Sequence, residues 1–272
     1  MTRTLAGKVA VVTGASRGIG KQTCLALVEL GASVVLASRT EEPRERTPGT
    51  LHDTAEAIRN AGGEALVVRT DLAEQADLDR LIAVTLEHHR HVDILINNAA
   101  YTVGRALWAH VPELMREQWE KGFAVNVTAP LMLIEGFWAS MQERGGGVIV
   151  NVTSGAANLQ PLDASIRLPG GTLPDNGPLY GASKAALNRM ANVIANEGVP
   201  HNIAVINLEP GFVLIETMAQ TFAETGVDGA EMGAIPTTVP ARAIAFLCSC
   251  DDPMQYSGQI VSAPALVDAL QG

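Results

Sequence analysis

Charged residues and cysteines are scarce in this chain, and long apolar runs are missing from it. Charged side chains make up 18% of the 272 residues, and 29 acidic against 19 basic residues leave a net charge of −10. Because proteins that bind a phosphate backbone carry clustered Lys and Arg, this balance argues against nucleic acid as a partner. No run reaches the ~20 apolar residues of a membrane helix, and the polar N-terminal segment carries no signal-peptide core. The sequence therefore predicts a cytoplasmic protein without a membrane partner.

The sequence also has few residues that could form disulfides or bind a metal ion. Cys24, Cys248 and Cys250 are too few and too unevenly spaced for a disulfide framework or a zinc site. Cys248 and Cys250 could pair with each other, but two buried free thiols are the favoured interpretation. The histidines within residues 88–91 occupy consecutive or alternate positions at an expected helix end, with no carboxylate spaced as a co-ligand. We expect a solvated helix end there and no metal site.

What the chain does have is apolar sequence in alternating short and long segments. Hydrophobic residues make up 47% of it, enough for a large core. Short runs bounded by turn residues fit a parallel sheet buried on both faces, and their alternation with helical stretches indicates a doubly wound α/β Rossmann fold. No repeat or linker divides the chain, so we expect a single domain over residues 1–272. The strand-length runs are Val9–Val12, Val34–Ala37, Ala65–Val68, Ile94–Ile96, Val148–Val152, Ile203–Leu208 and Gln259–Ser262, and the helical stretches include Ile19–Leu30, Leu51–Ala61, Leu78–Leu86 and Met115–Gln142.

A glycine-rich segment, TGASRGIG at Thr13–Gly20, joins the first apolar run to the first helical stretch. Gly14 permits a tight turn, Gly18 lets the backbone approach a pyrophosphate, and Gly20 allows the helix to pack closely on the strand. The backbone N–H groups and the positive end of the helix dipole then favour phosphates. With a strand before it and a helix after it, the segment predicts a dinucleotide site rather than a plain glycine-rich turn.

The end of the second apolar run bears on the choice of cofactor. An NAD site usually places an acidic residue there for the ribose 2′-hydroxyl, whereas an arginine accommodates the 2′-phosphate of NADP. This chain has Ser38 and Arg39, and Arg17 of the glycine loop could bring a second guanidinium to the same phosphate. NADP is therefore favoured over NAD. Glu41 and Glu42 are the counter-indication, because a different loop path could bring one of them to the ribose.

Two further segments follow strands at the edge of the sheet where a ligand lies. Asp71, followed by Leu72, could hydrogen-bond the adenine or cap the next helix, and the sequence favours neither role. Asn98 and Ala99 follow the fourth run within residues 97–100. Paired asparagines there can hold neighbouring strands together and leave a floor of small residues beneath the cofactor.

Tyr180 and Lys184 stand four residues apart in a helical stretch, so their side chains project from one face. The ordinary tyrosine pKa, near 10, is too high for acid–base work at neutral pH, and a nearby ammonium would lower it by favouring the phenolate. Tyr180 could then exchange a proton with a substrate oxygen. Ser154 ends the fifth run at the same edge, where its hydroxyl could hold a carbonyl oxygen.

Asn126 lies in a helical stretch, four residues before Pro130. Proline has no N–H for the carbonyl four residues earlier, and its ring clashes with that carbonyl. We therefore expect a kink that releases the main-chain oxygen of Asn126. The released oxygen could hold a water beside an active site, and a purely structural kink is the alternative.

Taken in order, these motifs resemble those of the short-chain dehydrogenase/reductase family over essentially the whole chain. They are Thr-Gly-x-x-x-Gly-x-Gly, Asn-Asn-Ala, the helical Asn, the strand-end Ser, Tyr-x-x-x-Lys and the later Pro210-Gly211. The resemblance implies a seven-stranded parallel sheet with helices on both faces. It also implies that Tyr transfers the substrate proton, Ser polarises the oxygen, Lys binds the nicotinamide ribose and lowers the Tyr pKa, and Asn holds a water linked to Lys. The implied catalytic tetrad is Asn126, Ser154, Tyr180 and Lys184.

The resemblance further implies a set of cofactor contacts and an oligomer. The dinucleotide-binding residues would be Gly14, Ser16, Arg17, Gly18, Ile19, Gly20, Ser38, Arg39, Asp71, Leu72, Asn98, Ala99, Tyr180, Lys184, Pro210, Gly211 and Val213, with Val213 at the carboxamide. A homotetramer or homodimer would pack through the helices of Asn126 and Tyr180. The apolar residues Leu131, Leu133, Ile134, Phe137 and Trp138 fit such an interface and the core equally well.

Several positions depart from the family pattern. Ser154 and Tyr180 are 26 positions apart, about twice the common family spacing, and the extra residues belong to a Pro/Gly-rich segment that has to loop out. Glu209 precedes Pro210 where a small residue is usual, and it could face the pocket. Substrate loops are expected at about 155–179 and 212–235. The long segment 39–50 resembles that of a hydroxysteroid-dehydrogenase-like subgroup.

Together these features predict an NADP(H)-dependent oxidoreductase that interconverts a ketone and a secondary alcohol, with Tyr180 as general acid/base. The expected partner is a small or medium, largely apolar carbonyl or alcohol substrate. A non-catalytic NADP-binding regulator and a reductase of an activated C=C bond are the alternatives, and the complete tetrad argues against the regulator. The expected pocket residues are Leu159, Leu162, Ile166, Leu168, Phe212 and Met218.

Overall fold

A seven-stranded, fully parallel sheet forms the centre of the molecule, in the order β3-β2-β1-β4-β5-β6-β7. The computed structural model describes residues 4–42, 48–102, 116–158, 177–215, 229, 231 and 233–271. The expected fold class and strand number are confirmed. The strands are β1 (Val9–Thr13), β2 (Ser33–Ser38), β3 (Ala65–Arg69), β4 (Ile94–Asn97), β5 (Gly147–Val152), β6 (Ile203–Glu209) and β7 (Ile260–Ser262).

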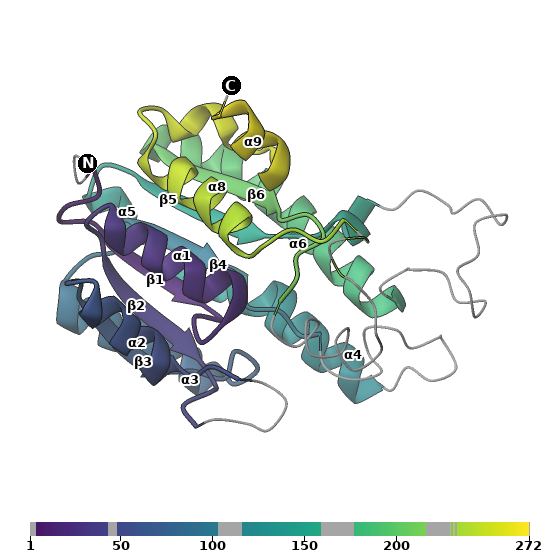
Figure 1. Cartoon of the computed structure of the whole chain (residues 1–272), viewed down its shortest axis with the longest axis horizontal. Helices are drawn as coiled ribbons and strands as arrows, with labels where there is room; N and C mark the ends of the chain where they lie inside the picture. Colours follow the sequence, from purple (N-terminus) through teal and green to yellow (C-terminus); the bar gives the residue numbers. More distant parts are fainter. Residues whose placement is uncertain are drawn as a thin grey trace, which may run out of the picture.

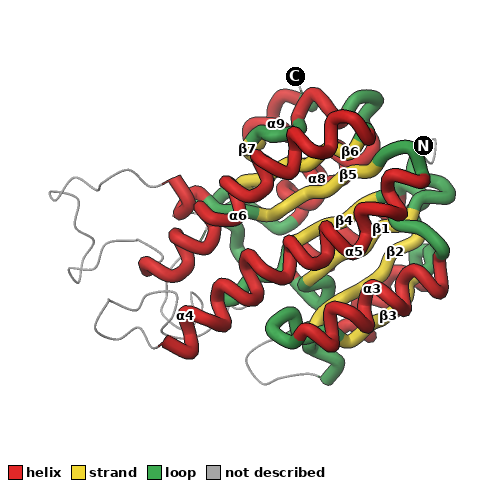
Figure 2. The backbone as a smooth tube through the Cα atoms, turned by 180° about the vertical axis from the view of Figure 1, so that it is seen from behind, coloured by secondary structure: helices red, strands yellow, loops and turns green. Residues whose placement is uncertain are grey.

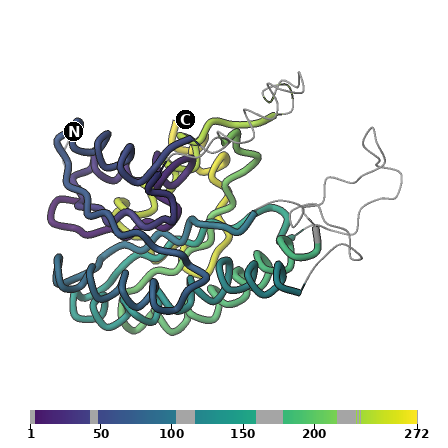
Figure 3. The backbone as a smooth tube through the Cα atoms, turned by 90° about the horizontal axis from the view of Figure 1, so that it is seen from below, coloured from purple at the N-terminus to yellow at the C-terminus, as the bar shows by residue number. Residues whose placement is uncertain are grey.

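Helices cover both faces of this sheet. Helices α1, α2, α8 and α9 lie in front of it in Figure 1, and the view from behind in Figure 2 shows α3, α5 and α6 on the other face. Seen from below in Figure 3, the teal and green helices line one side of the sheet. The helices are α1 (Gly18–Glu29), α2 (Leu51–Asn60), α3 (Gln75–His89), α4 (Arg116–Phe123), α5 (Ala129–Glu143), α6 (Gly177–Gly198), α8 (Thr238–Ser249) and α9 (Ala263–Ala269), with 3₁₀ turns at Gly155–Asn158, Val199–His201 and Pro253–Tyr256.

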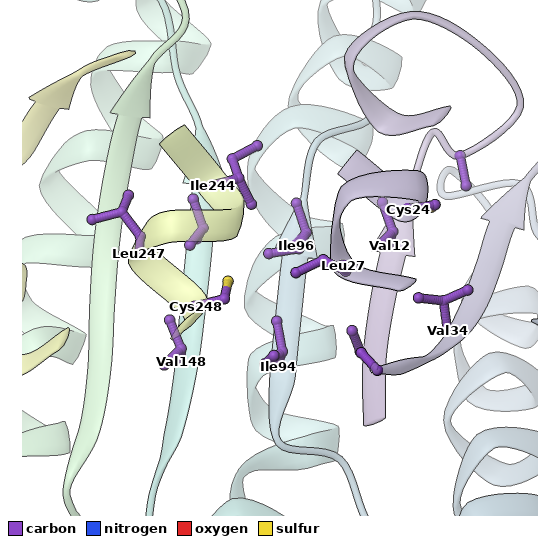
Figure 4. Packing of buried hydrophobic residues seen from close by; sticks show 14 of the residues in the cluster. Val12, Cys24, Leu27, Val34, Ile94, Ile96, Val148, Ile244, Leu247 and Cys248 are labelled. Atoms are coloured by element: carbon purple, nitrogen blue, oxygen red, sulfur yellow. The ribbon is translucent and has the colours of Figure 1, made fainter. Parts of the chain in front are cut away.

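Successive residues of each strand supply two separate apolar cores, because side chains alternate between the faces of a sheet. One core joins even-numbered residues of β1 and β4 to α1 and α8, which lie side by side on one face of the sheet, with Leu27 of α1 and Cys248 of α8 over the strands (Figure 4). The other core lies under α3, α5 and α6. All three cysteines are free thiols. Burial on both faces explains why the strands read as continuous apolar runs.

Asn126, the expected asparagine of the tetrad, is carried by a long helix with a π-helical turn in its middle. The turn spans Ala124–Thr128, between α4 and α5, and the N–H of Ala129 donates to the Ala124 carbonyl. Pro130 follows at once. A proline that cannot complete the ordinary bonding pattern is a known cause of such irregular turns, so the helix is irregular around Asn126, and the release of the Asn126 main-chain oxygen stays a prediction.

The whole segment Arg116–Glu143 is long and apolar enough to cross a membrane by length and composition alone. The fold nevertheless buries part of its apolar surface. Leu133, Ile134 and Phe137 are buried in the core beneath α5, whereas Leu131 is exposed. The core interpretation therefore holds for three of the five residues that fitted either a core or an interface.

Some expectations differ from the structure or fall outside its described part. Helices α8 and α9 lie outside the helical stretches expected from the sequence pattern. Most of the Pro/Gly-rich segment is outside the described residues, as are the expected pocket residues Leu159, Leu162, Ile166, Leu168 and Met218.

Candidate active site

The glycine loop that follows β1 has the shape that its sequence predicts. Gly14 and Gly18 have φ of 68° and 56°, a left-handed conformation that favours glycine. A Cβ on Gly14 would lie 2.8 Å from Asn98 Nδ2, and one on Gly20 would overlap the Gly14 carbonyl oxygen. The loop therefore packs against the β4 edge and lets α1 approach β1 closely. Since the strand order reverses between β1 and β4, the loop lies at the crevice where a dinucleotide binds in this class of fold.

The N-terminus of α1 fits the phosphates of such a cofactor. Arg17, the N-cap residue, makes no side-chain capping bond, and the first turn contains no acidic residue. The positive end of the helix dipole is thus left uncompensated by an acidic side chain of its own. Together with the close backbone approach at Gly14 and Gly20, this matches what a pyrophosphate requires.

Part of the long segment after β2 folds back onto the glycine loop. Arg17 Nη2 donates to the Gly49 carbonyl at 3.1 Å, and Ser38 Oγ donates to Ser16 Oγ at 3.2 Å. Gly49 has φ +96°, and a Cβ there would lie 2.8 Å from the Ser16 carbonyl oxygen. Thr54 Oγ1, on α2, donates to the Ala15 carbonyl at 2.9 Å. The segment thus fixes the arginine of the loop, although residues 43–47 lie outside the described part.

The expected 2′-phosphate arginine lies in a network of charges at the adenine end of the crevice. Arg39 Nη1 is 3.8 Å from Asp71 Oδ2. Glu41, the acidic residue that could instead reach a ribose, lies 3.8 Å from Arg69 Nε. Arg69 also contacts Asp77, at 3.8 Å between Nη1 and Oδ2. Of the two glutamates that could reach the ribose, Glu41 is therefore paired with another cation, while Arg39 stays beside the strand end.

Asp71 shapes the turn after β3 rather than capping a helix. Its Oδ1 accepts a hydrogen bond from the N–H of Ala73 at 3.1 Å, but α3 begins at Gln75 with Glu74 as its N-cap. The N–H of Asp71 donates to Asp77 Oδ2 at 2.7 Å, and this bond is the main cause of the lowered pKa of Asp77. The helix-cap alternative is therefore wrong, and the position at the strand edge beside Leu72 remains compatible with adenine.

Asn98 and Ala99 form the floor between the glycine loop and β4. Both backbone N–H groups donate to Thr13 Oγ1, at 3.0 and 3.1 Å. Asn98 Nδ2 donates to the Thr13 carbonyl at 2.8 Å. The asparagine side chain thus holds two neighbouring strand ends together, as the sequence predicts.

A ladder of buried asparagines continues from this point across the sheet. Asn97 Nδ2 donates to Asn151 Oδ1 at 2.9 Å, and Asn151 Nδ2 donates to Asn207 Oδ1 at 3.3 Å. Asn207 Nδ2 then donates to the Asn188 carbonyl of α6 at 3.4 Å. The three strand residues are in register on β4, β5 and β6. Asn151 and Asn207 are not among the site residues expected from the sequence, although an asparagine inside each of two apolar runs is a visible signal.

The four tetrad residues come together at the carboxyl edge of the sheet. The Ser154 hydroxyl is hydrogen-bonded to the Tyr180 phenol. Lys184 is 2% exposed, its Nζ lies 5.8 Å from the Tyr180 ring centroid, and it donates to the Val152 carbonyl at 2.7 Å. The long separation of Ser154 and Tyr180 in sequence is therefore bridged in space.

Asn126 joins the tetrad through its side chain. Its Oδ1 accepts from the N–H of Tyr101 at 2.7 Å, and its Nδ2 donates to Ser183 Oγ at 3.0 Å. Ser183 Oγ in turn donates to the Tyr180 carbonyl at 2.9 Å. The π-helical turn is thereby tied to the first turns of α6, which carry the tyrosine.

Burial dominates the ionisation of Tyr180 and Lys184. It raises the pKa of Tyr180 above its usual value, against a smaller lowering by the Ser154 hydrogen bond. It also lowers the pKa of Lys184 from 10.5 to about 8. The expected net lowering of the Tyr180 pKa is wrong for this structure, because desolvation of the phenolate is the largest effect on it.

The segment after β6 closes the crevice on its other side. Gly211 has φ +81°, and a Cβ there would lie 3.0 Å from Pro264 Cγ. Val213 pairs with Ile235 in an isolated parallel bridge and is buried. Pro210 and Gly211 therefore turn the chain at the strand edge, where the resemblance expects a cofactor contact.

Comparisons with known proteins agree with this geometry. The sequence model of the short chain dehydrogenase family matches residues 8–226. An uncharacterized oxidoreductase of Methylorubrum extorquens is 31% identical over 271 residues, which cover 95% of this chain and 97% of that protein. The likeness therefore extends over nearly the full length of both chains.

Solved structures give the same result. A 7α-hydroxysteroid dehydrogenase complexed with NADH and 7-oxoglycochenodeoxycholic acid superposes with a TM-score of 0.77 at 25% identity, covering 96% of this chain and 94% of that one. L-sorbose reductase from Gluconobacter frateurii, complexed with NADPH and L-sorbose, gives a TM-score of 0.78 at 26% identity, covering 96% and 97%. The expected likeness to hydroxysteroid dehydrogenases is confirmed. The chain belongs to the short-chain dehydrogenase family and is an oxidoreductase that uses a nicotinamide cofactor.

Proposed function

We propose that this enzyme interconverts a ketone and a secondary alcohol with NADP(H), using Tyr180 as general acid/base. The observation that carries the proposal is the convergence of Ser154, Tyr180 and Lys184 at the sheet edge, beside a glycine loop shaped for a dinucleotide. A nicotinamide bound there would supply or take up the hydride. The proton would be transferred by side chains of the protein.

Each tetrad residue has a role that follows from its contacts. In the reducing direction the Tyr180 phenol donates its proton to the carbonyl oxygen, and the Ser154 hydroxyl hydrogen-bonds the same oxygen. Because burial keeps the phenol protonated, Tyr180 enters this direction in the form that can donate. Lys184, 5.8 Å from the ring centroid, favours the phenolate that remains whenever the amine is charged. Asn126 positions the tyrosine helix through Ser183.

The preference for NADP rests on two arginines. Arg39 stands at the end of β2, where a 2′-phosphate would lie, and Arg17 is oriented by the Gly49 carbonyl. Glu41 is engaged by Arg69. Related structures contain NADPH in one case and NADH in another, so the family alone does not decide between them.

Two copies or four copies of the chain would pack through α4, α5 and α6. Three large apolar side chains are exposed on these helices: Trp119 at 37%, Leu131 at 42% and Val193 at 44%. Exposed apolar residues on adjacent helices favour a contact with a second copy. A location in a reducing compartment, the cytoplasm, is supported by the three free thiols.

The proposal is tested by binding and turnover together. We expect NADPH, followed by its fluorescence, to bind more tightly than NADH, and Arg39→Ala to reduce this difference by about tenfold or more because a charge-assisted contact is lost. Tyr180→Phe should keep NADPH binding but lower kcat on ketones by at least about 100-fold, the usual contribution of general acid catalysis.

Other outcomes would favour other functions. NADPH binding without turnover of ketones or alcohols would leave the non-catalytic NADP-binding protein as the better explanation. Reduction of activated C=C bonds alone would favour an enoyl-type reductase, and tighter binding of NADH would show that Arg39 does not select the cofactor.

A further inference from the structure

Glu209 places a carboxylate beside the candidate catalytic centre. It is the last residue of β6, at the carboxyl edge of the sheet, and it is partly buried. Side chains alternate along a strand, so Glu209 shares a face with Asn207 and Val205. Val205 packs in the core beneath α6, and Asn207 donates to an α6 carbonyl. Glu209 is therefore on the face that is covered by the helix of Tyr180.

The carboxylate lies against the residue that follows the catalytic serine. A Cβ on Gly155 would be 2.9 Å from Glu209 Oε1. Gly155 and Ser154 are consecutive, with Cα atoms about 3.8 Å apart. The 3₁₀ turn that starts at Gly155 also packs on α6, because a Cβ on Gly181 would lie 3.1 Å from the Ala156 carbonyl oxygen. The charged group is thus part of the wall around Ser154 and Tyr180.

Within the described part of the chain, the Glu209 carboxylate makes neither a hydrogen bond nor an ion pair. The carboxylate of Asp93, by contrast, has several charged partners. Asp93, at the opposite edge, contacts Lys8 at 2.8 Å, His91 at 3.3 Å and Arg144 at 3.4 Å. A partly buried carboxylate without such partners loses hydration, and no hydrogen bond or ion pair compensates for that loss. Glu209 therefore has hydrogen-bond acceptors to offer to a ligand.

We infer that Glu209 is a substrate-selecting residue that accepts a hydrogen bond from a hydroxyl or ammonium group next to the reacting carbon. This inference rests on the proposed function, which brings the substrate oxygen to Ser154 and Tyr180. A substituent on the neighbouring carbon then meets the wall formed by Gly155 and Glu209. The substrate class is a vicinal diol or amino alcohol and the corresponding ketone, in place of a largely apolar ketone. An anionic group at the same position is disfavoured by like charge.

The test compares three alcohols that differ at one carbon. We would measure kcat/KM with NADP for cyclohexanol, trans-1,2-cyclohexanediol and trans-2-aminocyclohexanol. Wild type should prefer a donor-bearing alcohol, and Glu209→Ala should reduce the ratio of that alcohol to cyclohexanol by about 10- to 100-fold, the effect of losing a hydrogen bond to a charged group. Glu197→Gln, which removes an exposed carboxylate from the far end of α6, serves as control and should leave the ratio unchanged.

Glu209→Gln separates the two donors. An amide oxygen still accepts a hydrogen bond from a hydroxyl but lacks the negative charge that attracts an ammonium. The preference over cyclohexanol should therefore fall less for the diol than for the amino alcohol. Gly155→Ala gives an independent check, because its methyl group displaces the carboxylate without removing it. We expect its ratio to move in the same direction as that of Glu209→Ala.

The inference fails if Glu209→Ala, with a melting temperature close to that of wild type, leaves the ratio unchanged. It also fails if wild type prefers cyclohexanol. If none of the three alcohols is oxidised although NADPH binds, the proposed function is what fails. Calorimetric titration of the diol into the protein–NADP complex then decides the role of Glu209, since equal affinity for wild type and Glu209→Ala overturns it.

Discussion

The burial of Lys184 predicts a specific pH dependence of folding stability. The side chain is 2% exposed and donates to the Val152 carbonyl, and no carboxylate pairs with it among the described residues. Burial lowers its pKa from 10.5 to about 8. At neutral pH the amine is mostly charged in the folded protein, but burial makes this charged form less favourable than it is in the unfolded chain, and the difference costs stability.

The sign and size of the effect follow from proton linkage. Between pH 8 and pH 10.5 the unfolded chain keeps the lysine proton while the folded chain has largely lost it, so stability rises with pH. For a shift of this size, Lys184 should make the folded state about 1.4 kcal/mol more stable at pH 9 than at pH 7, relative to a chain without the group. The contribution is greatest above pH 10.5 and is lost as the pH falls through about 8.

Urea denaturation followed by far-UV circular dichroism measures this contribution. The free energies of unfolding of wild type and Lys184→Met are compared at pH 7, 8 and 9 in the absence of cofactor. Taking the difference cancels other titrating groups such as Cys24, whose raised pKa lowers stability over the same range. Lys121→Met, which removes a partly exposed lysine from α4, is the matched control and should show no such trend.

A difference between wild type and Lys184→Met that stays constant from pH 7 to pH 9 would refute the reasoning. It would mean that the folded protein holds the charged amine without penalty. A wild-type free energy of unfolding that falls with pH relative to that of Lys184→Met would reverse the sign and point to a favourable charge partner for the lysine.

Three further predictions concern packing and burial. Gly20→Ala pushes a methyl group into the Gly14 carbonyl oxygen, so its free energy of unfolding in urea should fall by about 1–3 kcal/mol, together with its affinity for NADPH; full retention of both would contradict the close approach. Asn151→Leu breaks the asparagine ladder on both sides and should cost about 2–4 kcal/mol, because the amides on β4 and β6 lose a buried partner; a neutral effect in the same assay would show that water replaces it. Cys24 is buried with a raised pKa and Cys250 is partly exposed, so a disulfide reagent should label Cys250 first and Cys24 only on unfolding, whereas equal labelling rates would count against the burial.

The fold could be predicted because its signals are local. Each strand is buried on both faces and so reads as an apolar run, and each helix that was expected has the 3.6-residue spacing of a half-buried surface. Helix α8 was harder to identify, because Thr238–Ser249 is buried over most of its surface and lacks a polar stripe. The glycine loop could be predicted for the same local reason, since Gly14 needs its left-handed φ whatever surrounds it.

The residues of the candidate site could be predicted from the sequence, but their pKa shifts and hydrogen-bond partners could not. Tyr180 and Lys184 are four residues apart on one helix, and this proximity is a property of the helix alone. The direction of the Tyr180 pKa shift depends instead on how much water the phenolate loses, which is decided by the elements packed around α6. The role of Asp71 likewise depended on the exact start of α3.

The sequence by itself determined the alternation of strands and helices, the dinucleotide loop and the residues of the tetrad. Only the tertiary structure decided that Ser154 reaches Tyr180, which is 26 positions later in the sequence, that Asn151 bridges two strands, and that the Glu209 carboxylate lies beside Gly155. The physical reason is the range of the interactions. Backbone conformation and side-chain periodicity are set by near neighbours in the chain, whereas desolvation and long-range hydrogen bonds exist only once distant segments have packed together.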